Sequence, residues 1–449
     1  MHRCIEQCLN LDRDLKKVLQ QTDSTMKRIK VMDIELSSPI GGIQGLDDHE
    51  FILVLVRLHG VPIGYVKVPA TGGVCSPDLL IKGIIQSHGQ AVVSHQLEDC
   101  LATTGSGRGF ELRGLSDAVH PVYQGPTPRV TVAVCTRDRT AYVGKCLDSL
   151  RLLDYPNVDL LVVNNSPSSN DTERLVKERY PDFRYFFEPR PGLNWARNRA
   201  ITEARGEIIA FTDDDVLVDP GWVKGLVSAF AENPCVMAVT GLVVPYELET
   251  EAQILFESRG GFGRGFVRKC FQGDPEAGRQ LATIFGDTGK FGTGANMAFR
   301  KALFDEIGFF DPALDVGTLT HGGGDLEMFF RVVKHGYALV YEPSAMVRHR
   351  HRREYSELRT QLNGWGAGFF SYLIRGFLSY PDERLGFIKI VMRTLGWHVF
   401  RLIKSILTPC EFPRDLMVAD LNGSLSSLFR YRRAQRTADN IRATHGPLV

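Results

Sequence analysis

The chain has 449 residues, of which 43% are apolar and 23% charged, which is the composition of a globular protein with two or three domains. Its 53 basic and 52 acidic side chains leave a net charge of +1, and this balance argues against a protein that binds nucleic acid. None of its nine cysteines has the spacing of a CxxC motif or a zinc finger, which indicates reduced thiols and a cytoplasmic protein. Cys135, Cys146 and Cys235 stand in apolar runs and are expected to be buried.

The first residues of the chain do not resemble a secretory signal, because charged side chains interrupt every apolar run before Met26. No window reaches the roughly 18 to 20 uninterrupted apolar residues of a membrane span, so we expect a soluble or peripheral protein. A strand-like run begins at Met26, which leaves Met1 and Met26 as alternative starts.

Residues 1–123 are predicted to form a small α+β accessory domain. Short β-branched runs indicate strands at 29–36, 50–58 and 64–68, and apolar spacing indicates a helix at 77–87. No group of titratable side chains in this part indicates a site. The stretch 117–129, rich in proline and glycine, is predicted to be a linker.

Residues 129–355 are predicted to form an α/β domain around a mostly parallel sheet. Near-continuous apolar runs, typical of strands buried on both faces, occur at 130–136, 158–165, 183–188, 207–212 and 235–244. Helical patterns separate them at 141–152, 171–180, 194–205 and 220–233. Ligands bind such sheets beyond the carboxyl ends of the strands, so the candidate site is expected there.

Residues 356–449 are predicted to form a helical extension. The run 385–407 alternates apolar residues with basic ones, and two interpretations stay open: the helix packs on the main domain or lies on a membrane surface. The basic tail from Phe429 is expected to be mobile.

Three consecutive acids, Asp213, Asp214 and Asp215, follow the buried run 207–212. Carboxylate oxygens at the end of such a strand suit Mg²⁺ or Mn²⁺, and a divalent ion suits a diphosphate leaving group. The alternative is a solvated acidic turn, in which the repulsion between the three charges would be unrelieved.

Other segments are informative in combination with these acids. In the glycine-rich stretch 291–297, the backbone can approach a ligand closely and Asn296 can hydrogen-bond sugar hydroxyls. Asp325 follows three glycines and opens a predicted helix, where the roles of N-cap and general base are compatible. The basic segment 347–352 offers two imidazoles for a metal and guanidinium groups for a diphosphate. A dinucleotide fingerprint and a P-loop are both missing.

Five ordered motifs between about Arg129 and Arg352 resemble family 2 glycosyltransferases of the GT-A fold. They are GLNWARN at 192–198, ARGEIIAFTDDD at 204–215, GTGANMAFR at 292–300, GGDLE at 323–327, and YEP at 341–343 followed by HRHR at 349–352. The resemblance implies an inverting transferase that uses Mn²⁺ or Mg²⁺ and a nucleotide-sugar, with a UDP-sugar favoured. The amphipathic run 385–407 favours a glycan or lipid-linked acceptor, and with the reduced cysteines it indicates a protein in the cytoplasm, at most peripheral at the inner face of the membrane.

The resemblance also implies roles for particular residues. Asp325 falls at the general base, Asp213 and Asp215 at the metal-binding acids, and His349, with His351 second, at the late metal-binding histidine. Contacts to the donor are expected from Thr136, Arg137, Asn165, Arg197, Asp213 and Asp214. Contacts to the acceptor or sugar are expected from Gly294, Asn296 and Glu327.

The sequence departs from the family pattern at two places. Asn164 and Asn165 replace the acids that often follow the second strand, which removes the usual carboxylate contact to uracil. Gly324 replaces the acid that often precedes the general base. The competing interpretations are a sugar-1-phosphate nucleotidyltransferase, a non-catalytic nucleotide-sugar-binding or scaffold protein and, less favoured, a glycoside hydrolase.

Overall fold

The computed structural model describes residues 28–104, 123, 125–274, 281–408 and 412–446. Cys4, Cys8, Met26 and part of the predicted linker 117–129 lie outside the described residues. The chain divides into two compact units. Unit 1 comprises residues 1–126, 244–267 and 350–353, and unit 2 comprises residues 127–243, 268–349 and 354–449.

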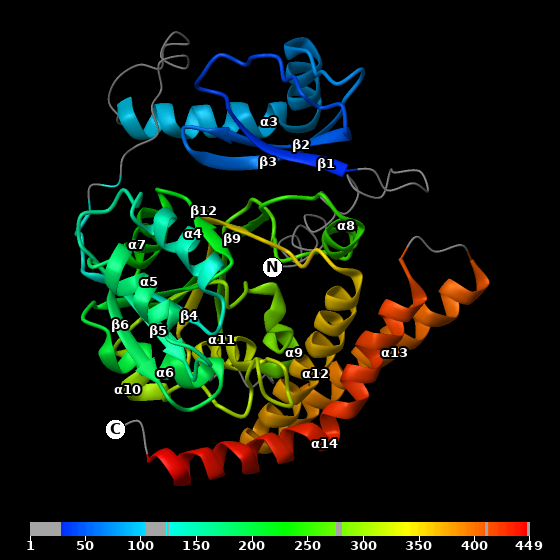
Figure 1. The fold of residues 1–449 in the computed structure, drawn as a ribbon. Coiled ribbons are helices and arrows are strands. Elements are labelled where there is room, and N and C mark those ends of the chain that lie inside the picture. Colours follow the sequence, from blue (N-terminus) through cyan, green and yellow to red (C-terminus); the bar gives the residue numbers. More distant parts are fainter. Residues whose placement is uncertain (1–27, 105–122, 124, 275–280, 409–411, 447–449) are drawn as a thin grey trace. The chain divides into compact units, whose positions relative to one another are not determined.

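Unit 1 contains a three-stranded sheet covered by one long helix (Figure 1). β1 (Arg28–Glu35) pairs in parallel with β2 (His49–Leu58), and β2 forms an antiparallel hairpin with β3 (Val61–Pro69). α3 (Pro77–Thr104) buries its apolar face on this sheet and is much longer than the predicted 77–87. Segment 244–267 also belongs to this unit: it contains α8 (Glu251–Ser258), and Leu248 accepts a backbone hydrogen bond from Ile29 at 3.0 Å.

Unit 2 is built around a nine-stranded sheet in the order β10-β12-β9-β11-β7-β4-β5-β6, with β8 paired to β12. β4, β5, β6 and β7 are parallel neighbours, and β9 runs the same way because β11 is antiparallel to both β7 and β9. The strands are β4 (Val130–Thr136), β5 (Val158–Asn165), β6 (Arg184–Glu188), β7 (Ile208–Asp213), β8 (Val216–Val218), β9 (Val236–Pro245), β10 (Lys269–Gln272), β11 (Asn296–Arg300) and β12 (Ala338–His349).

Helices cover both faces of this sheet. On one face α6 and α11 share a core with the strands, in which Phe211, Met297 and Phe329 are buried. On the other face Asn296, the neighbour of Met297 along β11, bonds Trp222 of α7, as the alternation of a strand requires. The helices are α4 (Thr140–Leu150), α5 (Asp171–Arg179), α6 (Leu193–Glu203), α7 (Trp222–Glu232), α9 (Leu281–Phe285), α10 (Leu303–Ile307) and α11 (Gly324–Lys334).

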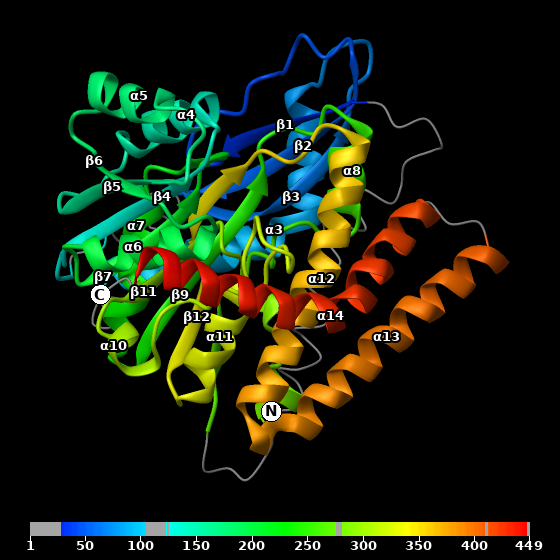
Figure 2. The ribbon, with the colours of Figure 1, turned by 60° about the horizontal axis from the view of Figure 1, so that its bottom comes forward.

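The C-terminal part of unit 2 is helical. α12 (Tyr355–Ser379), α13 (Arg384–Leu407) and α14 (Arg414–His445) follow one another, and α14 lies along α12 (Figure 2). The tail from Phe429 was expected to be mobile, and this expectation is wrong: Tyr431, Ala434 and Ala438 of α14 are buried against α12, because small and aromatic residues recur there at helical spacing.

The expected fold class is confirmed: an α/β unit with a mostly parallel sheet, a small N-terminal α+β part and a helical C-terminal extension. Cys135 and Cys146 are buried as expected, but Cys235 is exposed because it lies just before β9 begins. Within the described ranges, each helix is either too short or too polar to span a bilayer.

Candidate active site

The carboxyl ends of neighbouring strands bring the acids and the histidine together. Asp213 is the last residue of β7, and the parallel register of β4 and β7 places Thr136 beside it. β8 begins directly after Asp215, and its first residue, Val216, pairs with His349 at the end of β12. Two strand pairings thus gather side chains that are far apart in the sequence.

Asp213, Asp215 and His349 form a cluster suited to a metal ion. One carboxylate oxygen of each acid and one ring nitrogen of the histidine lie within 4.8 Å of one another. His349 Nε2 is 3.3 Å from Asp215 Oδ1. His351, the second candidate from the sequence, instead places Nε2 2.6 Å from Glu257 Oε1 of unit 1.

Asp214, the middle acid, turns away from this cluster. It accepts hydrogen bonds from Thr136 Oγ1 at 2.7 Å and from Arg139 Nη1 at 2.5 Å. Arg139 also donates from Nη2 to Asp215 Oδ2 at 2.9 Å, so Asp215 Oδ1 is the oxygen that faces the histidine. Asp214 and Thr136 therefore fix the position of the site rather than contribute to the metal cluster.

Arg139 is the residue of this site that sequence reasoning missed. The prediction chose Arg137, which is exposed and has Asp138 within 3.8 Å. Asp138 adopts a left-handed φ of 54°, and its Oδ1 accepts a hydrogen bond from the Ser168 amide at 2.7 Å. This turn directs the second arginine, not the first, toward the acids. The only signal in the sequence is that Arg139 directly precedes α4, whose first residue is Thr140.

The acids are held in surroundings that disfavour their charges. Burial raises the pKa of Asp213 to about 6, and the charge of Asp215 adds to the rise, whereas Arg197 and Arg139 lower it. Burial also raises the pKa of Asp214 to about 7, although Arg139 lies 2.5 Å away. Loss of water therefore outweighs ion pairing at both carboxyl groups.

Asp325 is held at the start of α11 by the glycine-rich loop. Its Oδ2 accepts a hydrogen bond from the Gly294 amide at 2.8 Å. A Cβ atom at Gly294 would lie 2.6 Å from Arg197 Nη2 and 3.2 Å from Asp325 Oδ2, so only glycine fits between the two side chains. Arg197 is buried, and its charge acts on Asp213. The acids, this guanidinium group and Asp325 are therefore electrostatically coupled.

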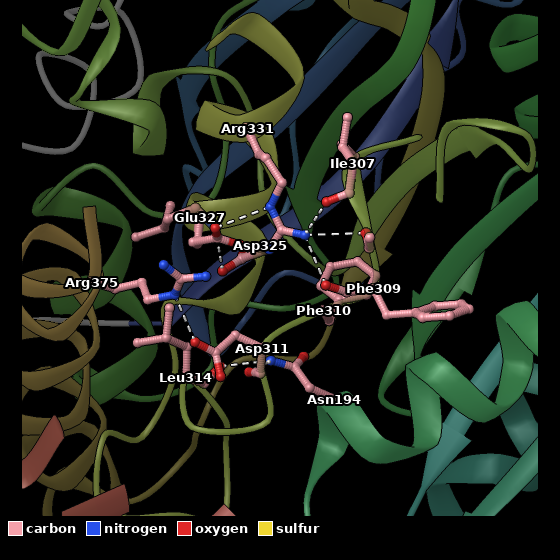
Figure 3. A network of polar contacts seen from close by, with 12 residues as sticks. Asn194, Ile307, Phe309, Phe310, Asp311, Leu314, Asp325, Glu327, Arg331 and Arg375 are labelled. Carbon is pink, nitrogen blue, oxygen red and sulfur yellow. Dashed lines mark hydrogen bonds and ion pairs between the residues drawn. The ribbon is translucent and has the colours of Figure 1, made fainter. Parts of the chain in front are cut away.

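The missing acid before Asp325 has a steric explanation. Gly324 is the first residue of α11, and a Cβ there would lie 2.2 Å from Asn194 Nδ2 and 2.7 Å from the Leu314 carbonyl oxygen. Asn194 Nδ2 donates to the carbonyls of Asp311 and Leu314 at 2.9 and 2.7 Å (Figure 3). The asparagine occupies the space that a side chain at position 324 would need.

Two other predicted residues, Glu327 and Asn165, have their polar groups engaged inside the protein. Glu327 is buried, and its Oε1 accepts a hydrogen bond from Arg331 Nε at 3.1 Å (Figure 3). Asn165 donates to the Arg190 carbonyl and accepts from the Gly192 amide, which ties the end of β5 to the loop before α6.

Asn296 is fully buried, with relative exposure of 0%. It donates to the carbonyls of Leu242 and Ala345 at 3.0 and 2.8 Å, and it accepts from Trp222 Nε1 at 2.8 Å. The amide thus joins strands inside the sheet and offers no group to a sugar in this arrangement.

Ligands bind open α/β sheets beyond the carboxyl ends of the strands, and the acidic cluster with His349 lies at this edge. Residues 131–308 match the model of Glycosyl transferase family 2. This segment is therefore similar to family 2 glycosyltransferases.

Curated relatives carry glycosyltransferase names. A Bacillus subtilis protein named as a glycosyltransferase, EpsH, is 31% identical over 184 residues, which are 40% of this chain and 49% of that protein. The pre-mycofactocin glycosyltransferase of Mycobacterium tuberculosis is 24% identical over 318 residues, which are 70% of this chain and 60% of that protein. The chain thus spans about half of the first relative and less than two thirds of the second.

Among solved structures, a mannosyltransferase from Pyrobaculum calidifontis in complex with GDP-Man and Mn²⁺ is 18% identical to this chain. The similarity covers 80% of this chain and 86% of that one, with a TM-score of 0.41. A TM-score below 0.5 is too low to establish a shared fold.

Gly324→Ala tests the packing before Asp325. The new Cβ would meet Asn194 Nδ2 and the Leu314 carbonyl, so we expect unfolding to become easier by about 1–3 kcal/mol, as for other overpacked sites. Gly396→Ala on exposed α13 is the matched control, because beyond its own helix backbone and chain neighbours no described atom lies within 4 Å of its Cβ position. The control should be neutral or more stable by up to about 1 kcal/mol. Denaturant unfolding measures both, and equal stability of the two variants would contradict the steric explanation.

Proposed function

We propose that this chain transfers a sugar from a nucleoside-diphosphate sugar to an acceptor hydroxyl, with inversion at the anomeric carbon and dependence on Mn²⁺ or Mg²⁺. The observation that carries the proposal is the Asp213, Asp215 and His349 cluster at the carboxyl edge of the sheet. The family 2 match over residues 131–308 supports the same reaction class.

The side chains of the cluster fit a divalent cation. Two carboxylates and one imidazole are ligands that Mn²⁺ accepts, and Mg²⁺ accepts the carboxylates. Asp213, Asp214, Asp215 and Asp325 bring four carboxylates together, whereas Arg139 and Arg197 are the two guanidinium groups that act on Asp213. This excess of negative charge would be relieved by one divalent cation. When bound, such an ion neutralises the charge that develops on the departing diphosphate.

The protein's own groups would supply binding and proton transfer. In our proposal Asp325 accepts the proton of the acceptor hydroxyl, because its carboxyl group is only half-buried at the start of α11. The Gly294 amide holds one of its oxygens, which fixes the side chain. Arg197, buried between Gly294 and the acids, would stabilise negative charge on the donor.

The donor would lie along the ends of β4, β5 and β7. We propose that Thr136 and Asn165 shape the nucleoside pocket through the loops they hold, and that Asp213 contacts the ribose. A UDP-sugar remains the favoured donor, although Asn164 and Asn165 stand where family members often carry acids.

We also propose that the enzyme works at the inner face of an anionic membrane, on a glycan or lipid-linked acceptor. Gly386, Phe387 and Ile390 bury one face of α13. The other face exposes an apolar stripe at helical spacing, namely Leu385, Ile388, Met392, Val399, Ile403, Ile406 and Leu407. Lys389, Arg393 and Lys404 lie on the same exposed helix, and a basic amphipathic surface suits an anionic lipid interface.

The first experiment tests the donor and the metal. Purified protein is mixed with UDP-, GDP- or dTDP-sugars and Mn²⁺ or Mg²⁺, with a CMP-sugar as a donor that lacks a diphosphate. We expect slow release of one nucleoside diphosphate, abolished by chelator. Asp215→Ala should lower the rate by about a hundredfold or more, because it removes a metal ligand.

Asp171→Ala, on the exposed start of α5, is the control and should retain full activity. Absence of binding to every donor, with folded protein and metal present, would favour the non-catalytic scaffold.

Asp325→Asn tests the general base. The amide oxygen can still accept from the Gly294 amide, whereas the bond from the Leu326 amide to Oδ1 is lost together with the basic group. We expect acceptor-dependent transfer to fall by about 10²–10⁴-fold with donor affinity nearly unchanged. Asp305→Asn removes an equal charge at an exposed position of α10 and should leave transfer intact. Full transfer by Asp325→Asn would remove the base assignment.

A sedimentation assay with phosphatidylcholine vesicles, with and without phosphatidylglycerol, tests the membrane surface. We expect binding only to the anionic vesicles, weakened by added salt and lost in Met392→Glu/Ile403→Glu, which places charges in the apolar stripe. Leu152→Glu changes an equally exposed apolar residue outside α13 and should not affect binding. Equal binding of the wild type and the double variant would contradict the proposal.

A further inference from the structure

Unit 1 contains a second group of metal-ligating side chains that lies outside the proposed active site. It consists of His59, His95 and Asp99, whose ligand atoms lie within 4.8 Å of one another. Two imidazoles and one carboxylate are a typical ligand set for Zn²⁺, whereas Mg²⁺ prefers oxygen ligands. All three residues belong to unit 1, and none takes part in the proposed transfer reaction.

Both imidazoles point to the same carboxylate oxygen. His59 Nδ1 lies 2.6 Å and His95 Nε2 lies 3.1 Å from Asp99 Oδ2. Asp99 is 3% exposed, so its negative charge needs nearby compensation. The histidines come from different elements: His59 lies in the turn between β2 and β3, and His95 lies on α3 one helical turn before Asp99.

The turn that carries His59 is fixed in place. His59 and Gly60 connect β2 to β3 and both have positive φ, at 52° and 82°, which defines a two-residue hairpin turn of type I′. The amides of both residues donate to the carboxylate of Glu35 at 2.9 Å. Arg57 Nη2 donates to the Gly60 carbonyl at 2.6 Å. The backbone that presents this imidazole is therefore held from both sides.

The helix fixes the other two ligands. His95 and Asp99 are four residues apart on α3, a spacing that places both side chains on one face of a helix. α3 is anchored on the sheet through Leu80 and Ile84, both buried. The three side chains therefore come from two well-anchored elements, the β2–β3 turn and α3, as a preorganised metal site requires.

We propose that His59, His95 and Asp99 bind Zn²⁺ and that the ion fastens the β2–β3 turn to the C-terminal half of α3. Bound zinc holds nitrogen and oxygen ligands at about 2.0–2.2 Å, which separates tetrahedral ligands by roughly 3.4 Å. The present separations of 2.6 and 3.1 Å from Asp99 need small side-chain rotations to reach that value. Without metal, the same atoms form a carboxylate bridge between two histidines, and the experiment separates the two states.

The test uses the full chain in an Asp215→Ala background, which disables the sheet-edge cluster so that zinc bound there is not counted. After treatment with chelator and its removal, Zn²⁺ is titrated calorimetrically and bound metal is measured by elemental analysis. We expect one Zn²⁺ per chain and a higher melting temperature with zinc, because the ion binds only the folded state. Co²⁺ should give the visible absorption of a site with nitrogen ligands.

Two ligand variants keep the local structure. His59→Asn retains a residue that favours the left-handed turn, and His95→Gln retains a long polar side chain on the helix. We expect each to weaken Zn²⁺ binding by at least about tenfold and to remove the zinc-dependent stabilisation. His88→Gln is the matched control, because His88 is also on α3 but bonds the Tyr65 carbonyl at 2.9 Å; it should bind zinc normally.

Cys4→Ser/Cys8→Ser should also bind zinc normally, which tests whether these two cysteines contribute to the measured zinc binding. Zinc binding that is unchanged in both ligand variants, or absent from the Asp215→Ala protein, would overturn the proposal. Melting temperatures in chelator report whether the variants fold. If a ligand variant does not fold, its partner variant and the Co²⁺ spectrum still decide the outcome.

Discussion

The structure of unit 2 depends on holding several carboxylates together at the end of a buried strand. β7 is apolar until Thr212, and water is excluded from its sides, so the acids that follow it lose solvation while they repel one another. The three carboxylates are compensated to different degrees. Asp214 receives a hydroxyl and the Arg139 guanidinium group, which Asp215 shares through one oxygen, whereas Asp213 and the other oxygen of Asp215 lie in the cluster with His349. The negative charge that a cation would neutralise is therefore concentrated where the nucleotide-sugar is proposed to bind.

The C-terminal helices help to set the position of Asp325. Gly323, in left-handed conformation with φ of 98°, lies so close to α12 that a Cβ would approach the Gly368 carbonyl oxygen to 2.5 Å. A Cβ on Gly368 would in turn lie 2.9 Å from the carbonyl carbon of Gly322. Glycines on both sides therefore allow the loop before Asp325 to rest on the helix backbone. The helical extension thus supports the loop before Asp325 through α12 and also carries the exposed apolar residues of α13.

The sequence was sufficient to predict β4, β5, β6, β7 and β9 and the residues that cluster at the edge of the sheet, but not β8, β10 and β11. Continuous apolar runs have few alternatives to buried parallel strands, and β4 and β5 begin and end where expected. The sequence could not predict which of two nearby residues of the same type points into the site. Arg139 rather than Arg137 reaches the acids because Asp138 takes a left-handed turn, and no spacing rule reports that turn.

Long-range packing is the second thing that the sequence could not reveal. The glycines before Asn296 favoured a sugar ligand, but the side chain is buried and makes two hydrogen bonds to other strands and one with Trp222 of α7. The tail after Phe429 looked mobile because it is basic, yet one face of α14 supplies Tyr431 to a core shared with α12. In unit 1, His59 and Asp99 are separated by 40 residues, and only the folding of α3 across the sheet brings them into contact.

The two clusters differ in ligand chemistry in a way that bears on which ion each would take. Asp213, Asp215 and His349 offer two carboxylates and one imidazole, so hard ions that accept oxygen ligands and exchange water readily are favoured there. His59, His95 and Asp99 reverse this ratio, and nitrogen ligands raise the affinity for Zn²⁺ relative to Mn²⁺, as the order of divalent affinities requires. A reaction that must release its diphosphate at each turnover is better served by a weakly held ion, whereas a fastening between a turn and a helix is better served by a tightly held one. The ligand ratio of each cluster thus agrees with the role that its position in the fold suggests.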